Sequence, residues 1–174
     1  MEKIYGATER HDQLLVFGTG KAILIYGFGQ DGESGFDYRH TFSHKPTKNE
    51  LMQVINDHID SITDERILWG YPWTVQHGPD AGKNVKVWLS KENQSNFKAK
   101  HDAALVYPDK VKFPMTYKIS EDDDKKAIYE VFESIEELAT FYLGGLAYIE
   151  ECYNAGWAEK DAVDYDALLG GGAE

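Results

Sequence analysis

The sequence predicts an α+β fold in which antiparallel β-hairpins and a meander alternate with three helices packed on one sheet face. Several short segments alternate apolar and polar residues with the two-residue period of a strand, and longer segments repeat apolar residues at helical spacing. The chain has 174 residues, of which 42% are hydrophobic, so it can bury a core of its own. We therefore expect either one ordinary domain or one domain with a sizeable N-terminal extension.

The N-terminal segment, residues 1–45, is predicted to be a β-meander that also anchors the chain to a partner. Residues 1–12 are polar and are expected to be loosely held. Apolar, β-prone segments follow at residues 14–17, 22–28 and 35–43, and turn-forming glycines separate them. These three segments are expected to pair as antiparallel neighbours.

Two capping boxes mark helix starts in the next part of the chain, an α+β domain over residues 46–160. Thr47 with Glu50 forms one box, and Ser134 with Glu137 forms the other. In each, a hydroxyl caps the first helical turn and a carboxylate reaches back to the chain before it. The helices are expected at residues 47–62, 90–105 and 135–155, and the last is expected to end at Gly156.

Two strand pairs are predicted between these helices. The first pairs residues 67–75 with residues 85–89 across an exposed loop, and Ser90 then caps the second helix. The second is a hairpin of residues 112–119 and 127–132 with a charged tip. Strands and helices therefore alternate along this part of the chain.

The C-terminal residues 161–174 are predicted to be a flexible, acidic and glycine-rich tail. It contains a short patch of Tyr165, Leu168 and Leu169. We interpret the patch as a frayed chain end, with a docking tag as the alternative.

The composition argues against several classes of partner. The formal net charge is −12, which repels phosphate backbones and anionic membrane surfaces, so neither nucleic acid nor membrane is expected as a partner. No signal peptide or membrane-spanning segment is expected either. The single cysteine, Cys152, cannot form a disulfide within the chain, which indicates a protein made in a reducing compartment.

The sequence lacks a recognisable catalytic or cofactor-binding motif. The glycines of residues 27–32 match a dinucleotide-binding pattern, but another strand follows them where the motif requires a helix. The histidines are scattered, and His77 is expected to be solvated in a loop, so we predict no metal and no cofactor. We therefore expect a protein that is not an enzyme; a small hydrolase built on scattered acids is the least favoured alternative.

Four aromatic residues are candidates for an interface or a glycan platform. Trp69, Tyr71 and Trp73 would share one face of a strand, and Trp88 lies on the strand predicted to pair with it. Such a surface suits a sugar ring or a partner subunit. Packing of the four side chains in the core is the alternative.

The long helix carries a second candidate surface, for contact with another copy of the chain. Gly144 and Gly145 leave room for another element to approach closely, and Tyr142 and Tyr148 flank them. A symmetric contact at this helix favours a homodimer.

Three segments together resemble a domain family of unknown function in phages and prophages. They are VWLSKENQSNFKAKHDAA, the preceding TDERILWGYPWTV and the later FYLGGLAYIEECYNAGWAEKD. The resemblance covers roughly residues 45–165. Similar proteins come mostly from phages of gut anaerobes, including crAss-like phages, where they resemble fibre-associated virion proteins of the head or tail.

The resemblance implies a structural protein of the virion, made in the cytoplasm of the bacterial host. Its expected partners are a second copy of itself, capsid or tail proteins, and a host surface glycan. A fibre-assembly chaperone and a carbohydrate-binding module for host attachment remain as alternatives.

Overall fold

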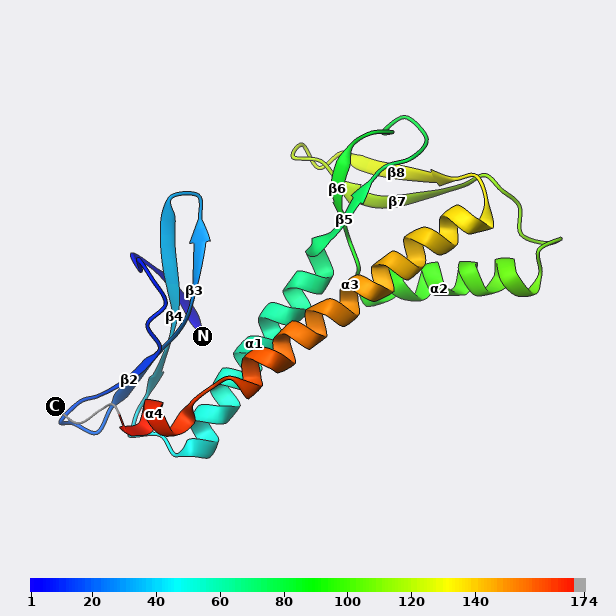
Figure 1. The fold of residues 1–174 in the computed structure, drawn as a ribbon. Coiled ribbons are helices and arrows are strands. Elements are labelled where there is room, and N and C mark those ends of the chain that lie inside the picture. Colours follow the sequence, from blue (N-terminus) through cyan, green and yellow to red (C-terminus); the bar gives the residue numbers. More distant parts are fainter. Residues whose placement is uncertain (171–174) are drawn as a thin grey trace. The chain divides into compact units, whose positions relative to one another are not determined.

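The computed structural model describes residues 1–170, and it confirms the predicted antiparallel α+β class (Figure 1). Its strands form one four-stranded sheet and two separate hairpins, where the sequence suggested helices on a single sheet face. The chain divides into two compact units, the first made of Met1–Ser61 with the residues from Gly156 onward, the second of Ile62–Ala155. Both divisions fall inside long helices, away from the boundaries after residues 45 and 160 that the sequence suggests.

The first unit contains the four-stranded antiparallel sheet, with strand order β1-β4-β3-β2. Its strands are β1 (Glu2–Tyr5), β2 (Gln13–Val16), β3 (Ala22–Asp31) and β4 (Ser34–Phe42). The three strands of the predicted meander are present. The expectation of a loosely held N-terminus is wrong for β1, because Lys3 pairs with Tyr38 of β4 and its ammonium lies 3.7 Å from the ring centre of Phe36.

The glycines that match a dinucleotide-binding pattern serve the geometry of the sheet. The register between β3 and β4 shifts between Tyr26 and Gly29, and Gly27 adopts a positive φ of 70° there. A Cβ on Gly29 would lie 2.1 Å from the ring of Phe36, so only glycine fits beneath that ring.

A helix of the first unit replaces the expected flexible tail. Helix α4 (Tyr165–Gly170) buries Leu168 in a cluster with apolar residues of the sheet and of helix α1 (Lys48–Gly70). The prediction failed because Leu168 finds an apolar surface, including Leu14 and Leu51, that lies far away in the sequence. The last four residues of the predicted tail, 171–174, lie outside the described residues.

Helix α1 is longer than predicted. Its capping box forms as expected, since Glu50 accepts a hydrogen bond from the Thr47 N–H at 2.8 Å. The helix then continues through residues 63–65, because buried Thr63 and Ile67 extend its apolar stripe at four-residue spacing. The strand predicted to begin at residue 67 therefore begins at Tyr71.

The second unit contains two hairpins and two helices in addition to the end of α1 (Figure 1), and its core is rich in aromatic side chains. Its further elements are β5 (Tyr71–Thr74), β6 (Asn84–Val87), α2 (Lys91–Val106), β7 (Met115–Glu121), β8 (Ala127–Phe132) and α3 (Ile135–Asp161). The ring of Phe141 contacts both Phe97 and Phe132 in this core, each with a centroid distance of 5.1 Å. The Ser90 cap of α2 forms as predicted, accepting a hydrogen bond from the Asn93 N–H.

Helix α3 continues beyond its predicted end. Gly156 does not take the left-handed conformation of a helix C-terminus, and the helix runs to Asp161. Cys152 is buried on this helix. Within residues 1–170, no helix has both the length and the apolar character needed to cross a lipid bilayer.

Candidate functional site

The four candidate platform aromatics do not share one surface. Trp69 lies on α1, is 51% exposed, and stacks on Trp88 with ring centroids 5.2 Å apart and planes 11° from parallel. Because residue 69 is helical, it does not continue the strand alternation of residues 71 and 73. Of the four candidate aromatics, Trp69 therefore provides the exposed ring, and its other face is covered by Trp88.

The other two platform residues pack into the second unit. Tyr71 is buried against Phe141, and burial raises the pKa of its hydroxyl to about 12. Trp73 is half-buried, and its indole Nε1–H donates to Glu130 Oε2 at 2.6 Å. Core packing, the alternative that the sequence left open, describes these two residues.

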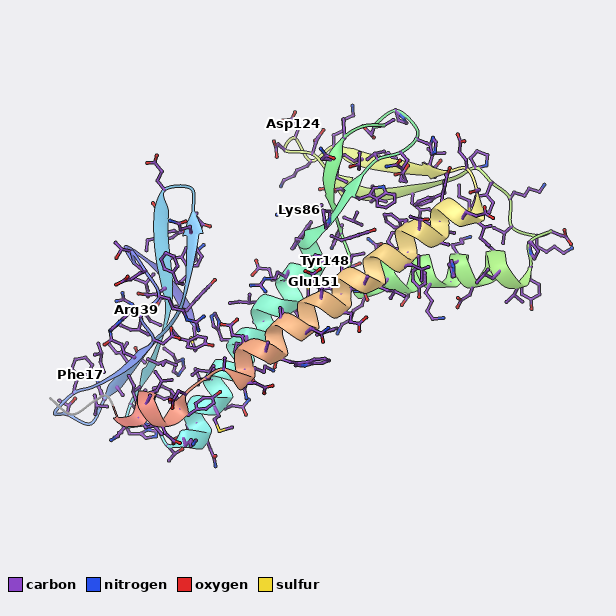
Figure 2. All side chains as sticks on the ribbon, viewed as in Figure 1. Phe17, Arg39, Lys86, Asp124, Tyr148 and Glu151 are labelled. Carbon is purple, nitrogen blue, oxygen red and sulfur yellow. The ribbon has the colours of Figure 1, made fainter. Side chains whose placement is uncertain are left out.

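The candidate self-contact residues of α3 have partners within the chain. A Cβ on Gly144 would lie 2.4 Å from the Tyr71 hydroxyl oxygen, so the space that the glycine provides is taken by Tyr71. The hydroxyl of Tyr148, which Figure 2 shows on α3, donates to the Arg66 carbonyl oxygen at 3.1 Å.

Tyr142 and Gly145 complete this face and also lie against the same chain. The ring of Tyr142 packs on His101 of α2, with centroids 4.9 Å apart. Gly145 is buried beside Tyr71 and Leu89. The four residues thus contribute to packing within the second unit, with Tyr142 and Tyr148 partly exposed.

The strongest exposed apolar feature is the α2 apolar run, defined as Leu105, Val106 and Tyr107. These three consecutive residues at the C-terminal end of α2 are 60%, 64% and 62% exposed. Isolated exposed apolar residues are common on proteins, but a consecutive run of large ones is unfavourable in water unless another surface covers it. From the sequence, Leu105 was predicted only as the last residue of a helix, and no functional site was predicted at residues 105–107.

An apolar groove lies between α2 and α3 in the same unit. Its volume is about 300 Å³, and Leu89, Phe97, Phe141, Leu146 and Ile149 provide its apolar walls. Lys91 and Lys98 are its charged lining residues. Lys98 pairs with Asp102 one turn further along α2.

A buried carboxylate organises the other side of the second unit. Glu130 of β8 is 0% exposed, and its oxygens accept hydrogen bonds from Trp73 Nε1–H, from the Gln76 N–H at 2.9 Å and from the His77 N–H at 3.0 Å. These bonds compensate the cost of burying the charge and attach the chain after β5 to β8. A cavity of about 350 Å³ adjoins Glu130 and Trp73.

His77 lies beside this carboxylate in a loop, as the sequence predicted, but its side chain is only partly exposed and lies against two further carboxylates. Its Nε2 lies 3.2 Å from Glu137 Oε1, and its Nδ1 lies 3.8 Å from Glu133 Oε1. Glu137 is the residue of the second capping box, and its other oxygen accepts the Glu133 N–H at 2.8 Å. The structure therefore brings together one imidazole and two carboxylates from distant parts of the chain.

The alternation of β8 contains a sequence signal for the buried position of Glu130. Ile128, Glu130 and Phe132 point to the same face of β8, and the two apolar members mark that face as buried. A lone acid between two inward apolar positions predicts a buried carboxylate with dedicated donors.

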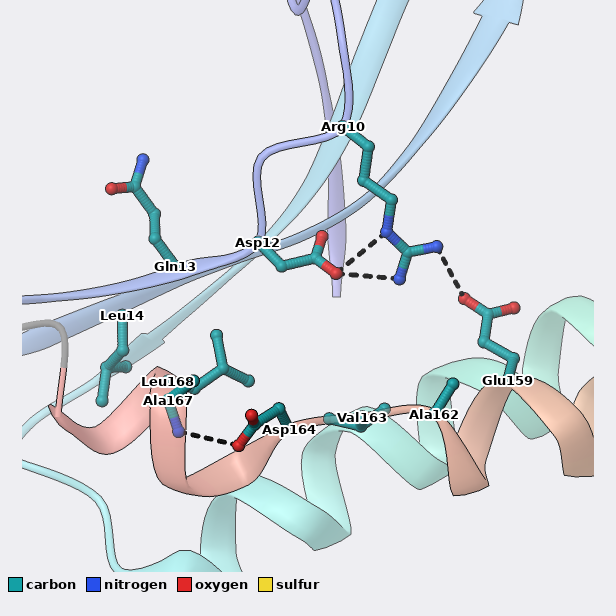
Figure 3. Close-up of a pocket in the computed structure, with 10 residues that line it drawn as sticks. All are labelled: Arg10, Asp12, Gln13, Leu14, Glu159, Ala162, Val163, Asp164, Ala167 and Leu168. Atoms are coloured by element: carbon teal, nitrogen blue, oxygen red, sulfur yellow. Dashed lines mark hydrogen bonds and ion pairs between the residues drawn. The ribbon is translucent and has the colours of Figure 1, made fainter.

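The first unit has a cavity of its own, of about 630 Å³, which is lined by charged and by apolar residues (Figure 3). Figure 3 shows Arg10 between Asp12 and Glu159, at 2.8 Å from Asp12 Oδ2 and 3.5 Å from Glu159 Oε1. The hydroxyl of Tyr26 donates to the same Glu159 oxygen, and burial raises the pKa of Tyr26. Arg10 is the one basic residue among the described residues that line the cavity, and both of its ion pairs are with carboxylates, Asp12 and Glu159.

Comparison of the chain with protein-family models, with curated proteins and with solved structures finds no match.

Proposed function

We propose that this protein is a non-enzymatic structural component of a phage virion, a fibre or accessory protein of the head or tail. The observation that carries the proposal is the α2 apolar run. Three exposed large apolar side chains in succession are expected to be covered in the assembled state. The resemblance of residues 45–165 to fibre-associated virion proteins supplies the expected setting.

The proposed mechanism is assembly by burial of this run against a partner. Covering one large apolar side chain contributes roughly 1.5–3 kcal/mol, so three of them supply a useful share of a protein–protein contact. The partner is a capsid or tail protein or a second copy of the chain, with a closed dimer as the favoured self-association.

Attachment through the N-terminal segment takes a different form from the one first expected. Since β1 is an ordered edge strand, its free edge is a candidate for strand addition by a partner. In this proposal the sheet of the first unit attaches to the particle, and the α2 apolar run contacts a neighbouring subunit.

The carbohydrate-binding alternative keeps one specific observation in its favour. The Trp69–Trp88 stack leaves Trp69 half exposed, and an exposed indole face suits a sugar ring. If this alternative is right, Trp69→Ala abolishes binding to a host surface glycan while the protein stays folded. Trp73→Ala is a poor test, because that indole also holds Glu130.

The proposal is tested by incorporation of variants into particles. The triple variant Leu105→Ser, Val106→Ser, Tyr107→Ser is compared with the wild type and with Phe17→Ser, an exposed aromatic at the turn between β2 and β3 (Figure 2). Quantitative mass spectrometry of purified particles measures the copies of each. We expect at least a tenfold loss for the triple variant alone, with unchanged circular dichroism.

Two results would contradict this proposal. Equal incorporation of the triple variant would remove the α2 apolar run from the assembly mechanism. Absence of the wild-type protein from particles, with abundance in infected cells, would favour the fibre-assembly chaperone.

A further inference from the structure

His77, Glu133 and Glu137 form a group of metal-ligand side chains that the assembly role does not use. His77 comes from the loop between β5 and β6, whereas Glu133 lies in the short connection between β8 and α3, and Glu137 lies in the first turn of α3. One ligand atom from each of the three residues lies within 4.8 Å of the others. Such convergence of distant residues is what a metal site requires.

Contacts outside the group hold its members in place. The His77 N–H is bonded to buried Glu130, and the next residue, Gly78, has a φ of +89° and lies against Val131. The capping interaction fixes one oxygen of Glu137 on the Glu133 N–H and leaves the other facing His77. Ligands that are positioned in advance bind a metal with little loss of conformational entropy.

A second histidine–glutamate pair, elsewhere in the chain, serves as a comparison for the group of His77, Glu133 and Glu137. His44 Nε2 lies 3.0 Å from Glu50 Oε1, and Glu50 is likewise the glutamate of a capping box. That histidine pairs with one carboxylate, whereas His77 faces two. A histidine that only supports a helix cap therefore does not require the second acid, Glu133.

Negative charge exceeds positive charge in the group of His77, Glu133 and Glu137. Among residues 1–170, no lysine or arginine pairs with Glu133 or Glu137, and the imidazole of His77 is the basic side chain beside both. Buried Glu130 adds a third carboxylate beside the same loop. A divalent cation would offset this concentration of negative charge, and a neutral imidazole would supply its nitrogen ligand.

We propose that His77, Glu133 and Glu137 bind one divalent first-row transition metal ion, represented by Zn²⁺. One imidazole with two carboxylates is a ligand set for such ions, while Mg²⁺ and Ca²⁺ prefer sites made of oxygen alone. Glu130 acts as a positioning residue through the His77 backbone. The bound ion would join the loop after β5 to the first turn of α3, and water would complete its coordination.

Metal binding is measured on the full chain after treatment with a chelator. Zn²⁺ is added, unbound metal is removed by dialysis, and bound metal is counted by mass spectrometry, with affinity from titration calorimetry. We expect one Zn²⁺ per chain, and at least a tenfold weaker affinity for both His77→Ala and Glu133→Gln. The matched control His44→Ala retains wild-type affinity, and Mg²⁺ and Ca²⁺ do not compete.

The exposed position of Glu133 makes Glu133→Gln a test that does not depend on a disturbed fold. A wild-type protein that retains no Zn²⁺ would overturn the proposal. So would Zn²⁺ binding that is lost in His44→Ala but kept in His77→Ala and Glu133→Gln.

Discussion

The hydroxyl of Tyr71 lies against Gly144 of α3 and donates a hydrogen bond to the Phe141 carbonyl oxygen at 3.2 Å. This contact joins β5 to α3 within one chain. It explains why the helix carries a glycine at a position where a second copy of the protein had seemed the natural partner.

Gly144→Ala is expected to destabilise the second unit. Its Cβ would lie 2.4 Å from the Tyr71 hydroxyl oxygen, and the crowding should cost about 1–3 kcal/mol, more than the gain in helix propensity of about 1 kcal/mol. Urea unfolding followed by circular dichroism measures the change. The neighbouring Gly145→Ala is the matched control: its Cβ meets Tyr71 at an ordinary 3.7 Å, so stability should stay equal or rise. Equal effects of the two variants would contradict this packing.

Glu130→Ala is expected to lower the free energy of unfolding by about 3–5 kcal/mol. The variant removes a fully buried carboxylate and leaves the Trp73 indole and the Gln76 and His77 amides without their acceptor. Chemical denaturation monitored by tryptophan fluorescence measures the loss. Glu136→Ala, at an exposed position in the first turn of α3, should change stability by less than about 0.5 kcal/mol. A Glu130 variant as stable as this control would show that the buried bonds contribute nothing.

Leu168→Ala is expected to destabilise the first unit by about 2–4 kcal/mol, because Leu168 is buried against residues that include Leu14 and Leu51. Thermal and urea unfolding give the change in stability. Leu15→Ala, which removes a partly exposed side chain from β2, should cost clearly less. If Leu168→Ala had no effect, the C-terminal segment would be the loose tail that its sequence suggested.

Acid should weaken the first unit through His58. Burial among rings that include Tyr38 lowers the pKa of His58 from 6.5 to about 4, so the folded state disfavours the charged form. The unfolded chain binds this proton below pH 6.5, and stability is lost as the pH falls from there toward 4, by about 2–3 kcal/mol.

Unfolding experiments between pH 7 and pH 4 test this contribution. His58→Leu should flatten the loss of stability in that interval, whereas replacement of the exposed His11 should leave it unchanged. An identical pH dependence in His58→Leu and in the wild type would assign the acid sensitivity to other groups.

The local signals in the sequence predicted the type of most elements. Capping by Thr47, Ser90 and Ser134 depends on residues next to the helix start, and these caps form. Apolar, β-prone segments separated by turn residues likewise predicted strands β2 and β3, and alternation predicted β4. These features were predictable because their physical causes lie within a few residues.

The errors concern places where distant residues decide the structure. Strand β1 forms because it pairs with the edge of β4. Helix α4 forms because Leu168 is buried in a cluster with apolar residues that lie far away in the sequence. Helix α1 extends past residue 63, because Ile67 packs in the core of the second unit. Trp69 therefore lies on this helix and not on the predicted strand. The group around His77 combines residues about 60 positions apart, which no local pattern predicts.

The most direct test of the central claim is immunogold electron microscopy of purified phage particles with an antibody to this protein. The proposed virion role predicts gold at one defined position on heads or tails, and that position identifies the attachment site. Unlabelled particles, with the protein abundant in lysates of infected cells, would contradict the claim.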